Sequence, residues 1–193
     1  MGLLDILRGQ RRPKRADLDR LFALTTASTT LSAELGYEPL PEAGICFKPV
    51  EAAAFTELRR DLDQLLAISG KTTGTTVRQE DDEHGFHWVV LGDASFEDLV
   101  TTAHLVNLTI EEQGFSEQLL CSLFGFRPTS GEGRPVYFVY AYKRGTFYPF
   151  VPLEGRRRDN ATELRLKAAL ERELPIEPDL TRWYPVWDAP VGS

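Results

Sequence analysis

The chain has 193 residues, of which 42% are hydrophobic and 26% charged, with two cysteines and a formal net charge of −7. A chain of this length buries a core without disulfides or a structural metal, and no apolar run approaches the roughly 20 residues of a membrane span, so we expect a soluble or peripheral protein. Phosphate neutralisation supplies most nucleic-acid affinity, so the acidic balance argues against nucleic acid as a partner.

Residues 1–16 are predicted to form a short amphipathic basic segment, and residues 17–193 a single α+β domain. A helix would place Leu3, Leu4 and Leu7 on one face, and four cations follow: Arg11, Arg12, Lys14 and Arg15. A small apolar face beside a basic patch is typical of weak binding to an anionic membrane. A helix of two turns buries too little apolar area to bind a membrane alone, so the favoured alternative is docking of the leucines onto the domain, with the basic run as a solvated linker. The segment lacks the order of a secretory signal, so we expect a cytoplasmic protein with only peripheral membrane contact.

In chain order, hydrophobic spacing first predicts a helix over 17–35, a strand over 44–48, a helix over about 51–69, and strands over 75–80 and 86–91. Gly36 ends the first helix, and Pro39 and Pro41 predict a loop before the first strand. The second helix has an apolar stripe of Phe55, Leu58, Leu62, Leu65 and Leu66.

In the second half of the sequence, the same patterns predict a helix capped by Ser95, strands over 118–126, 136–143 and 146–153, and a last helix from Asn160 to about residue 174. Gly114 ends the helix that Ser95 begins, and Asn160 with Glu163 fits a capping box. Consecutive strands favour antiparallel pairing, so we expect a two-layer α+β fold in which helices cover one mostly antiparallel sheet. The aromatic tail over 183–187 should pack back on that sheet.

No constellation in the sequence predicts catalysis, a metal site or a cofactor. His84 and His87 would point to opposite faces of an extended segment, and no further pair completes a zinc set. Cys46 and Cys121 lie in predicted strands without CxxC spacing, so they should act as small hydrophobes. A catalytic pair of Cys121 with His104 has no supporting motif.

The segment KRGTFYPFVPL over residues 143–153 is the first candidate recognition surface. It combines two cations with three rings: Lys143, Arg144, Phe147, Tyr148 and Phe150. Alternation along a strand places rings on both faces, which is typical of a strand between two layers or of one that presents a row to a partner. Core packing and partner binding both stay open.

The second candidate is the run of Arg156, Arg157 and Arg158 before Asn160, where the last helix should begin. Guanidinium groups beside helix N-terminal amides could hold a phosphate or carboxylate. The alternative is a solvated loop whose arginines pair with nearby acids.

Several segments together resemble the PspA-associated family PspAB over nearly the whole chain: MGLLDIL, GICFKP, QLLCSLFGF, YKRGTFYPFVPL, RRRDN and LPIEPDLTRWYPVW. The resemblance implies partners among a PspA-like coiled-coil protein, a PspAA-type domain and an HtpX-like membrane protease. It also implies a cytoplasmic accessory role in a phage-shock-like envelope stress response, and it supplies no catalytic residue. The element order is loosely similar to the YbjN and type III secretion chaperone-like fold, apart from the helix over 51–69.

Three functions follow as hypotheses. The leading one is a non-enzymatic adaptor that binds a protein of the stress system through the aromatic hairpin. The second is sensing of an anionic membrane by residues 1–15. The third is an enzyme acting on an anionic small molecule, with the arginines orienting it and Asp159 or His104 transferring a proton.

Overall fold

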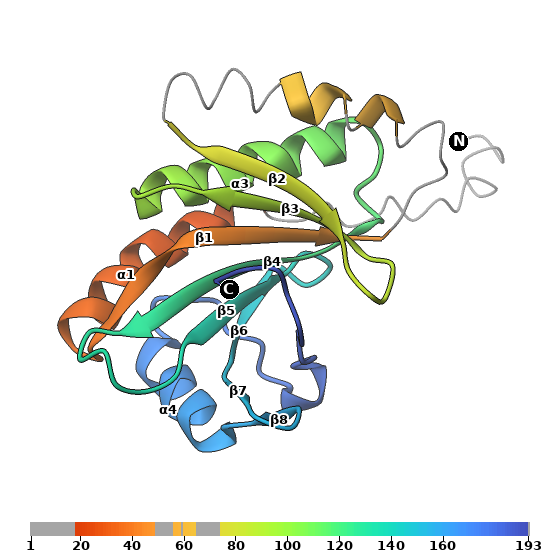
Figure 1. The fold of residues 1–193 in the computed structure, drawn as a ribbon. Helices are drawn as coiled ribbons and strands as arrows, with labels where there is room; N and C mark the ends of the chain where they lie inside the picture. Colours follow the sequence, from red (N-terminus) through yellow and green to blue (C-terminus); the bar gives the residue numbers. More distant parts are fainter. Residues whose placement is uncertain (1–17, 49–55, 59, 65–73, 193) are drawn as a thin grey trace, which may run out of the picture.

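The computed structural model describes residues 18–48, 56–58, 60–64 and 74–192. Its centre is a six-stranded antiparallel sheet in the order β2-β3-β1-β4-β5-β6 (Figure 1). The strands are β1 (Tyr37–Phe47), β2 (Thr76–Asp81), β3 (His87–Gly92), β4 (Leu119–Pro128), β5 (Val136–Ala141) and β6 (Thr146–Phe150). The predicted α+β class with one antiparallel sheet is confirmed.

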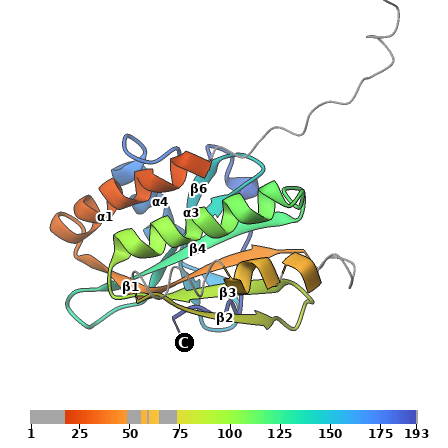
Figure 2. The same cartoon turned by 90° about the horizontal axis from the view of Figure 1, so that it is seen from above.

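Helices cover one face of this sheet: η1 (Leu18–Phe22), α1 (Ala23–Ala33), α3 (Phe96–Glu112) and α4 (Asn160–Leu170). Figure 2 shows α1 and α3 together on one side of the sheet and the C-terminus on the other. Residues 56–58 and 60–64 are also helical, and Leu58 and Leu62 are buried there. The other residues of that predicted stripe, Phe55, Leu65 and Leu66, lie outside the described residues.

The start, the stripe and the end of α3 follow from local sequence. Ser95 Oγ accepts the Asp98 amide at 3.3 Å, which satisfies one of the free N–H groups at the helix start. Gly114, with φ 86°, adopts the left-handed conformation that ends the helix. The side chains that face the core are buried, namely Leu99, Val100, Ala103, Val106 and Ile110. The predicted cap and stripe are confirmed.

The second face of the sheet is apolar as well, and the C-terminal tail, residues 183–192, covers it. Because side chains alternate along a strand, β1 buries Ile45 and Phe47 toward the helices and Cys46 toward the tail. The tail-side cluster also contains Trp88, Val90, Leu123, Val139, Tyr148, Phe150, Trp183 and Val191. The predicted packing of the tail on the sheet is confirmed, and the tail adds a partial third layer.

β1 corrects the prediction of a proline loop followed by a strand over 44–48, because the strand already begins at Tyr37. Its pairing with β3 begins only at Glu42, so the earlier half is paired with β4 alone. Pro39 lies in this half, and Pro41 lies where the β1–β4 register shifts. Proline has no backbone N–H, so strands tolerate it at such edge and bulge positions.

The strand predicted over 146–153 is also corrected, because β6 ends at Phe150. A separate hairpin follows, in which β7 (Pro152–Leu153) pairs with β8 (Arg157–Arg158). The predicted arginine loop therefore forms the turn and the second arm of a small hairpin. Gly155 and Arg156, with φ 71° and 52°, form its turn.

The start of α4 lies one position earlier than the predicted capping box places it. Asp159 is the N-cap, and its Oδ1 accepts the Thr162 amide at 3.0 Å. Glu163 does not cap the helix, because its carboxylate binds the guanidinium of Arg158. The helix ends at Leu170 rather than near residue 174.

Candidate functional site

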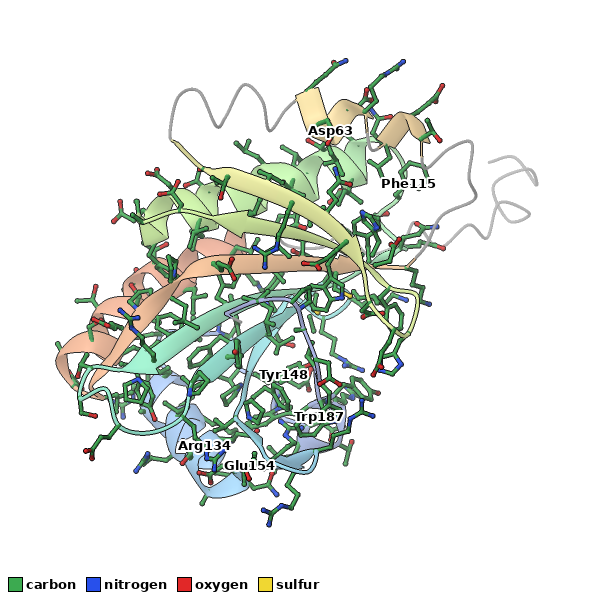
Figure 3. The ribbon with its side chains drawn as sticks, in the orientation of Figure 1. Asp63, Phe115, Arg134, Tyr148, Glu154 and Trp187 are labelled. Atoms are coloured by element: carbon green, nitrogen blue, oxygen red, sulfur yellow. The ribbon has the colours of Figure 1, made fainter. Side chains whose placement is uncertain are left out.

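A cavity of about 530 Å³ opens between the sheet and the C-terminal tail. This volume falls within the roughly 300–1,000 Å³ of small-ligand pockets. Its apolar walls include Phe86, Trp88, Leu120, Tyr148, Val186 and Trp187. Figure 3 labels Tyr148 and Trp187, which come from β6 and from the tail and line the same cavity.

A row of side chains across four neighbouring strands forms the floor of the cavity. Cys46 on β1 lies directly opposite Trp88 on β3 and directly opposite Cys121 on β4. Cys121 in turn lies opposite Ala141 at the end of β5. Directly opposite residues share one face of a sheet, so the row points toward the tail. All four residues line the cavity.

The roof of the cavity begins where the tail is attached to β6. The indole of Trp183 stacks on Tyr148, with the ring centroids 6.0 Å apart. Trp183 Nε1 donates to the Glu177 carbonyl at 3.0 Å, and Tyr148 Oη donates to the Tyr184 carbonyl at 2.9 Å. These contacts fix the start of the tail above the sheet.

The far end of the tail is attached to β1. The Gly192 amide donates to Glu42 Oε2 at 2.8 Å. Val191 packs against Gly44, where a Cβ atom would lie only 2.6 Å from Val191 Cγ2. Between the two attachments the tail is more open, and the Tyr184 side chain is 59% exposed. The tail is therefore attached to the sheet at both of its ends.

Asp82 holds one wall of the cavity in place. Its carboxylate accepts hydrogen bonds at 2.9 Å from Trp88 Nε1 and from the amides of His84 and Phe86. Partial burial acts to raise the pKa of Asp82, but these hydrogen bonds outweigh burial and hold the pKa below its ordinary value. Asp82 is ionised at neutral pH, and it orients the Trp88 ring.

Two cations stand at the opposite rim. Lys143 is exposed. Arg144 Nε lies 3.6 Å from Oε2 of Glu177, whose side chain is almost fully buried. Glu177 also accepts the Thr146 hydroxyl at 3.1 Å, which fixes it beside the hairpin. The rim thus offers one cation held by a buried acid and one that extends into solvent.

Cys46 and Tyr148, which also line the cavity, have raised pKa values. The neighbouring Cys121 thiol and burial together raise the pKa of the Cys46 thiol. Burial raises the pKa of Tyr148. A nucleophile or general base that works near neutral pH needs shifts in the opposite direction.

The structure separates the rings of the predicted recognition segment. Phe147 is buried on the helix side, whereas Tyr148 and Phe150 are buried on the tail side. All three agree with the core-packing interpretation, and they form no exposed row. The residues of this segment that line the cavity are Lys143, Arg144 and Tyr148. Partner binding through the segment stays a prediction, and a partner would reach the segment only through the residues that line the cavity.

The predicted anion-binding arginines point to different partners. Arg156 Nη2 lies 2.9 Å from Oε1 of Glu83 and 2.8 Å from Oδ2 of Asp188 on the tail. Arg158 Nε lies 2.9 Å from Oε1 of the buried Glu163. The two guanidinium groups are thus paired with acids, as in the alternative interpretation, and Arg156 helps to hold the tail.

The remaining predicted site residues either do not line the cavity or lie outside the described residues. Arg157 Nε donates to the Glu154 carbonyl at 3.2 Å, and Asn160 is the first residue of α4. The predicted membrane-binding residues Leu3, Leu4, Leu7, Arg11, Arg12, Lys14 and Arg15 lie outside the described residues.

Sequence reasoning placed the two cysteines in strands but missed that they are neighbours. The alternation of side chains along a strand could have shown which face Cys46 is on. Cys46 stands between the helix-facing residues Ile45 and Phe47, so it must point to the opposite face of the sheet. Its pairing with Cys121 joins segments far apart in the chain, and no local pattern reveals such a pairing.

Within the described ranges, no group of three or more His, Cys, Asp or Glu side chains is placed to hold a metal ion. The same ranges contain no helix that is long and apolar enough to cross a membrane.

Comparison with known proteins gives one family match. Residues 1–191 match the family model described as PspAB, PspA associated protein B. No curated protein matches the chain.

Proposed function

Because the chain belongs to the PspA associated protein B family, we propose that it is a non-enzymatic accessory protein of a PspA-type envelope stress response that acts by binding a protein partner. It acts in the cytoplasm, and any contact with the membrane is peripheral. Its first partner is PspA itself, a coiled-coil protein. A PspAA-type domain and an HtpX-like membrane protease are the other partners to be tested.

The single observation that carries this proposal is the cavity between the sheet and the tail. Interfaces are anchored where one partner inserts an apolar side chain into a desolvated pocket lined by aromatic rings. Trp88, Tyr148 and Trp187 supply such walls, and the volume of about 530 Å³ is large enough for a large apolar side chain. We expect an apolar anchor of PspA to enter here.

The charges at the rim indicate what flanks this anchor. The ammonium of Lys143 is exposed, and Arg144 lies beside it. An acidic residue next to the anchor would meet these cations, and a pair at the rim chiefly raises the rate of association. The preferred motif is therefore a large apolar residue with Asp or Glu nearby.

The titratable groups support a role without catalysis. Asp82 is occupied by three hydrogen-bond donors. The pKa values of Cys46 and Tyr148 are raised, so both groups stay protonated near neutral pH. Such groups suit the wall of a binding pocket better than acid-base or nucleophilic catalysis.

Binding to PspA from the same genome tests the proposal. Ala141→Leu should fill the floor of the cavity and weaken binding by about tenfold or more. Lys143→Glu should weaken binding by roughly severalfold at low salt and less at high salt, because rim charges are screened. Calorimetric titration of purified full-length proteins measures both effects.

The matched control is Arg172→Glu, which makes the same change of charge at an exposed position after α4. It should bind PspA like the wild type. Unchanged affinity in both cavity variants, with far-UV circular dichroism confirming their fold, would rule out this cavity as the PspA site. The same titrations with the PspAA-type domain and the protease then decide whether another partner uses it.

A further inference from the structure

Cys46 and Cys121 form a pair of thiols in the middle of the sheet. They lie directly opposite each other on β1 and β4, and both line the cavity. Opposite residues of an antiparallel pair have Cα atoms roughly 4.5–5.5 Å apart, inside the range of about 4.4–6.8 Å that disulfides span. The β1–β4 register shifts immediately after Cys46, where the chain can adjust to a small closure.

We propose that this pair is a redox site, at which Cys46 and Cys121 form a reversible disulfide by exchange with an anionic low-molecular-weight disulfide that enters the cavity. Both thiols are free in the structure. Disulfides of cytosolic proteins are generally transient and serve catalysis or redox sensing. The inference concerns the floor of the cavity and does not depend on which protein binds above it.

The two thiols differ in access, which assigns their order of reaction. Cys121 is partly exposed, whereas Cys46 is only 4% exposed. Contact with Cys121 and burial also raise the pKa of Cys46, which keeps its thiol protonated and unreactive at first. Cys121 is therefore the attacking thiol, and Cys46 is the resolving thiol.

The cavity suits a small anionic reagent. Its volume of about 530 Å³ admits a molecule of peptide size. Lys143 and Arg144 line the same cavity as the thiols, at the rim opposite the ionised Asp82. Arg144 is paired with Glu177, so the exposed ammonium of Lys143 is the charge that favours a disulfide with carboxylate groups.

The exchange proceeds in two steps that balance. The Cys121 thiolate attacks one sulfur of the reagent RSSR, forms a mixed disulfide and releases one thiolate RS⁻. The hydrogen bond with the Cys121 thiol, which raises the pKa of Cys46 most, is lost in the mixed disulfide. Cys46 then loses its proton to the first released RS⁻ and attacks Cys121 Sγ, which releases the second RS⁻. Two cysteine thiols are oxidised, RSSR is reduced to two RSH, and the two cysteine protons end on the released thiols.

The new bond would tie β1 to β4 and change the floor of the cavity beside Trp88, which lies directly opposite Cys46. A disulfide next to an indole quenches its fluorescence, so Trp88 should report the reaction. We therefore expect oxidation to lower tryptophan emission and to raise the melting temperature, because the bond closes a long loop of the chain.

The experiment incubates the full-length protein with oxidised glutathione at fixed ratios of oxidised to reduced form, followed by alkylation and intact mass measurement. The wild type should lose both alkylatable thiols and carry no glutathione. Cys46→Ala should retain one glutathione on Cys121, since the resolving thiol is missing. Cys121→Ala should react slowly or not at all, since Cys46 is buried.

Three results would overturn the inference. The wild type could accumulate stable glutathione adducts, it could remain fully reduced at ratios that oxidise it in urea, or Cys121→Ala could react as fast as Cys46→Ala. Far-UV circular dichroism of both alanine variants shows whether each is folded. If one variant is unfolded, the test uses the wild type alone. The oxidised wild type should carry no glutathione and emit less tryptophan fluorescence, and dithiothreitol should restore both thiols and the emission.

Discussion

At the scale of single residues, Asp82 shows how one side chain organises the edge of a cavity. Its carboxylate accepts two amides of its own turn and the indole N–H of Trp88, and so it couples the β2–β3 turn to the tail-side cluster. A hydrogen bond to a charged group contributes more than a neutral one. The lowered pKa of Asp82 records this preference for the ionised form.

Asp82→Asn should therefore cost about 1–2 kcal/mol of unfolding free energy at pH 7. The pKa of Asp82 is lower in the folded state than in the unfolded chain, where it is about 3.9. The ionised carboxylate therefore stabilises the folded protein at pH values above about 3.9. This contribution is lost as pH falls through the folded pKa, so the difference between wild type and variant should shrink between about pH 5 and pH 2.

Urea unfolding at several pH values, followed by tryptophan fluorescence, measures this difference. Glu132→Gln, which removes one negative charge from an exposed turn, separates the local effect from the general effect of charge. A difference between wild type and Asp82→Asn that stays constant with pH would contradict the role of the ionised carboxylate.

At the scale of elements, the sequence could predict what is local. The cap at Ser95, the stripe of α3 and its end at Gly114 depend on residues a few positions apart, and all three match the structure. The first half of β1 was missed because Pro39 and Pro41 are typical of a loop when their neighbours are unknown. The prolines are tolerated because β3 does not pair with this half of the strand and because the β1–β4 register shifts at Pro41, and both reasons depend on tertiary structure.

The contact between β1 and the tail gives a prediction about these two elements. Gly44→Ala should destabilise the protein by about 1–3 kcal/mol, because the new methyl group would overlap Val191 Cγ2. Val191→Ala alone should cost about 1–2 kcal/mol through lost burial. In the double variant the smaller side chain makes room for the methyl group, so the combined cost should fall below the sum.

Urea unfolding of the four proteins in this cycle measures the coupling. Strict additivity of the two costs would mean that Val191 does not pack on Gly44. A Gly44→Ala variant as stable as the wild type would lead to the same conclusion.

At the scale of the whole molecule, the sheet carries a core on each face. The helices bury one face, and the tail buries the other only in part, which leaves the cavity. The packing of the aromatic tail could be predicted from its rings, but the cavity could not. Its walls combine Cys46, Trp88, Cys121 and the tail, and their proximity depends on strand pairing over long separations.

Ending the chain after Trp183 tests this arrangement. Trp183 and its stacking on Tyr148 remain, whereas Val191 is lost from the tail-side cluster together with the residues that pack against it, Val186, Trp187 and Ala189. The loss of this apolar burial should lower the unfolding free energy by about 3–6 kcal/mol. Since the free energy of unfolding of domains of this size is about 5–15 kcal/mol in total, the helix layer and the sheet should persist.

Far-UV circular dichroism should therefore stay close to that of the wild type, while the midpoint of urea unfolding falls. An unchanged midpoint would mean that the tail contributes nothing to the fold, and a complete loss of helix signal would mean that the two faces fold as one inseparable core.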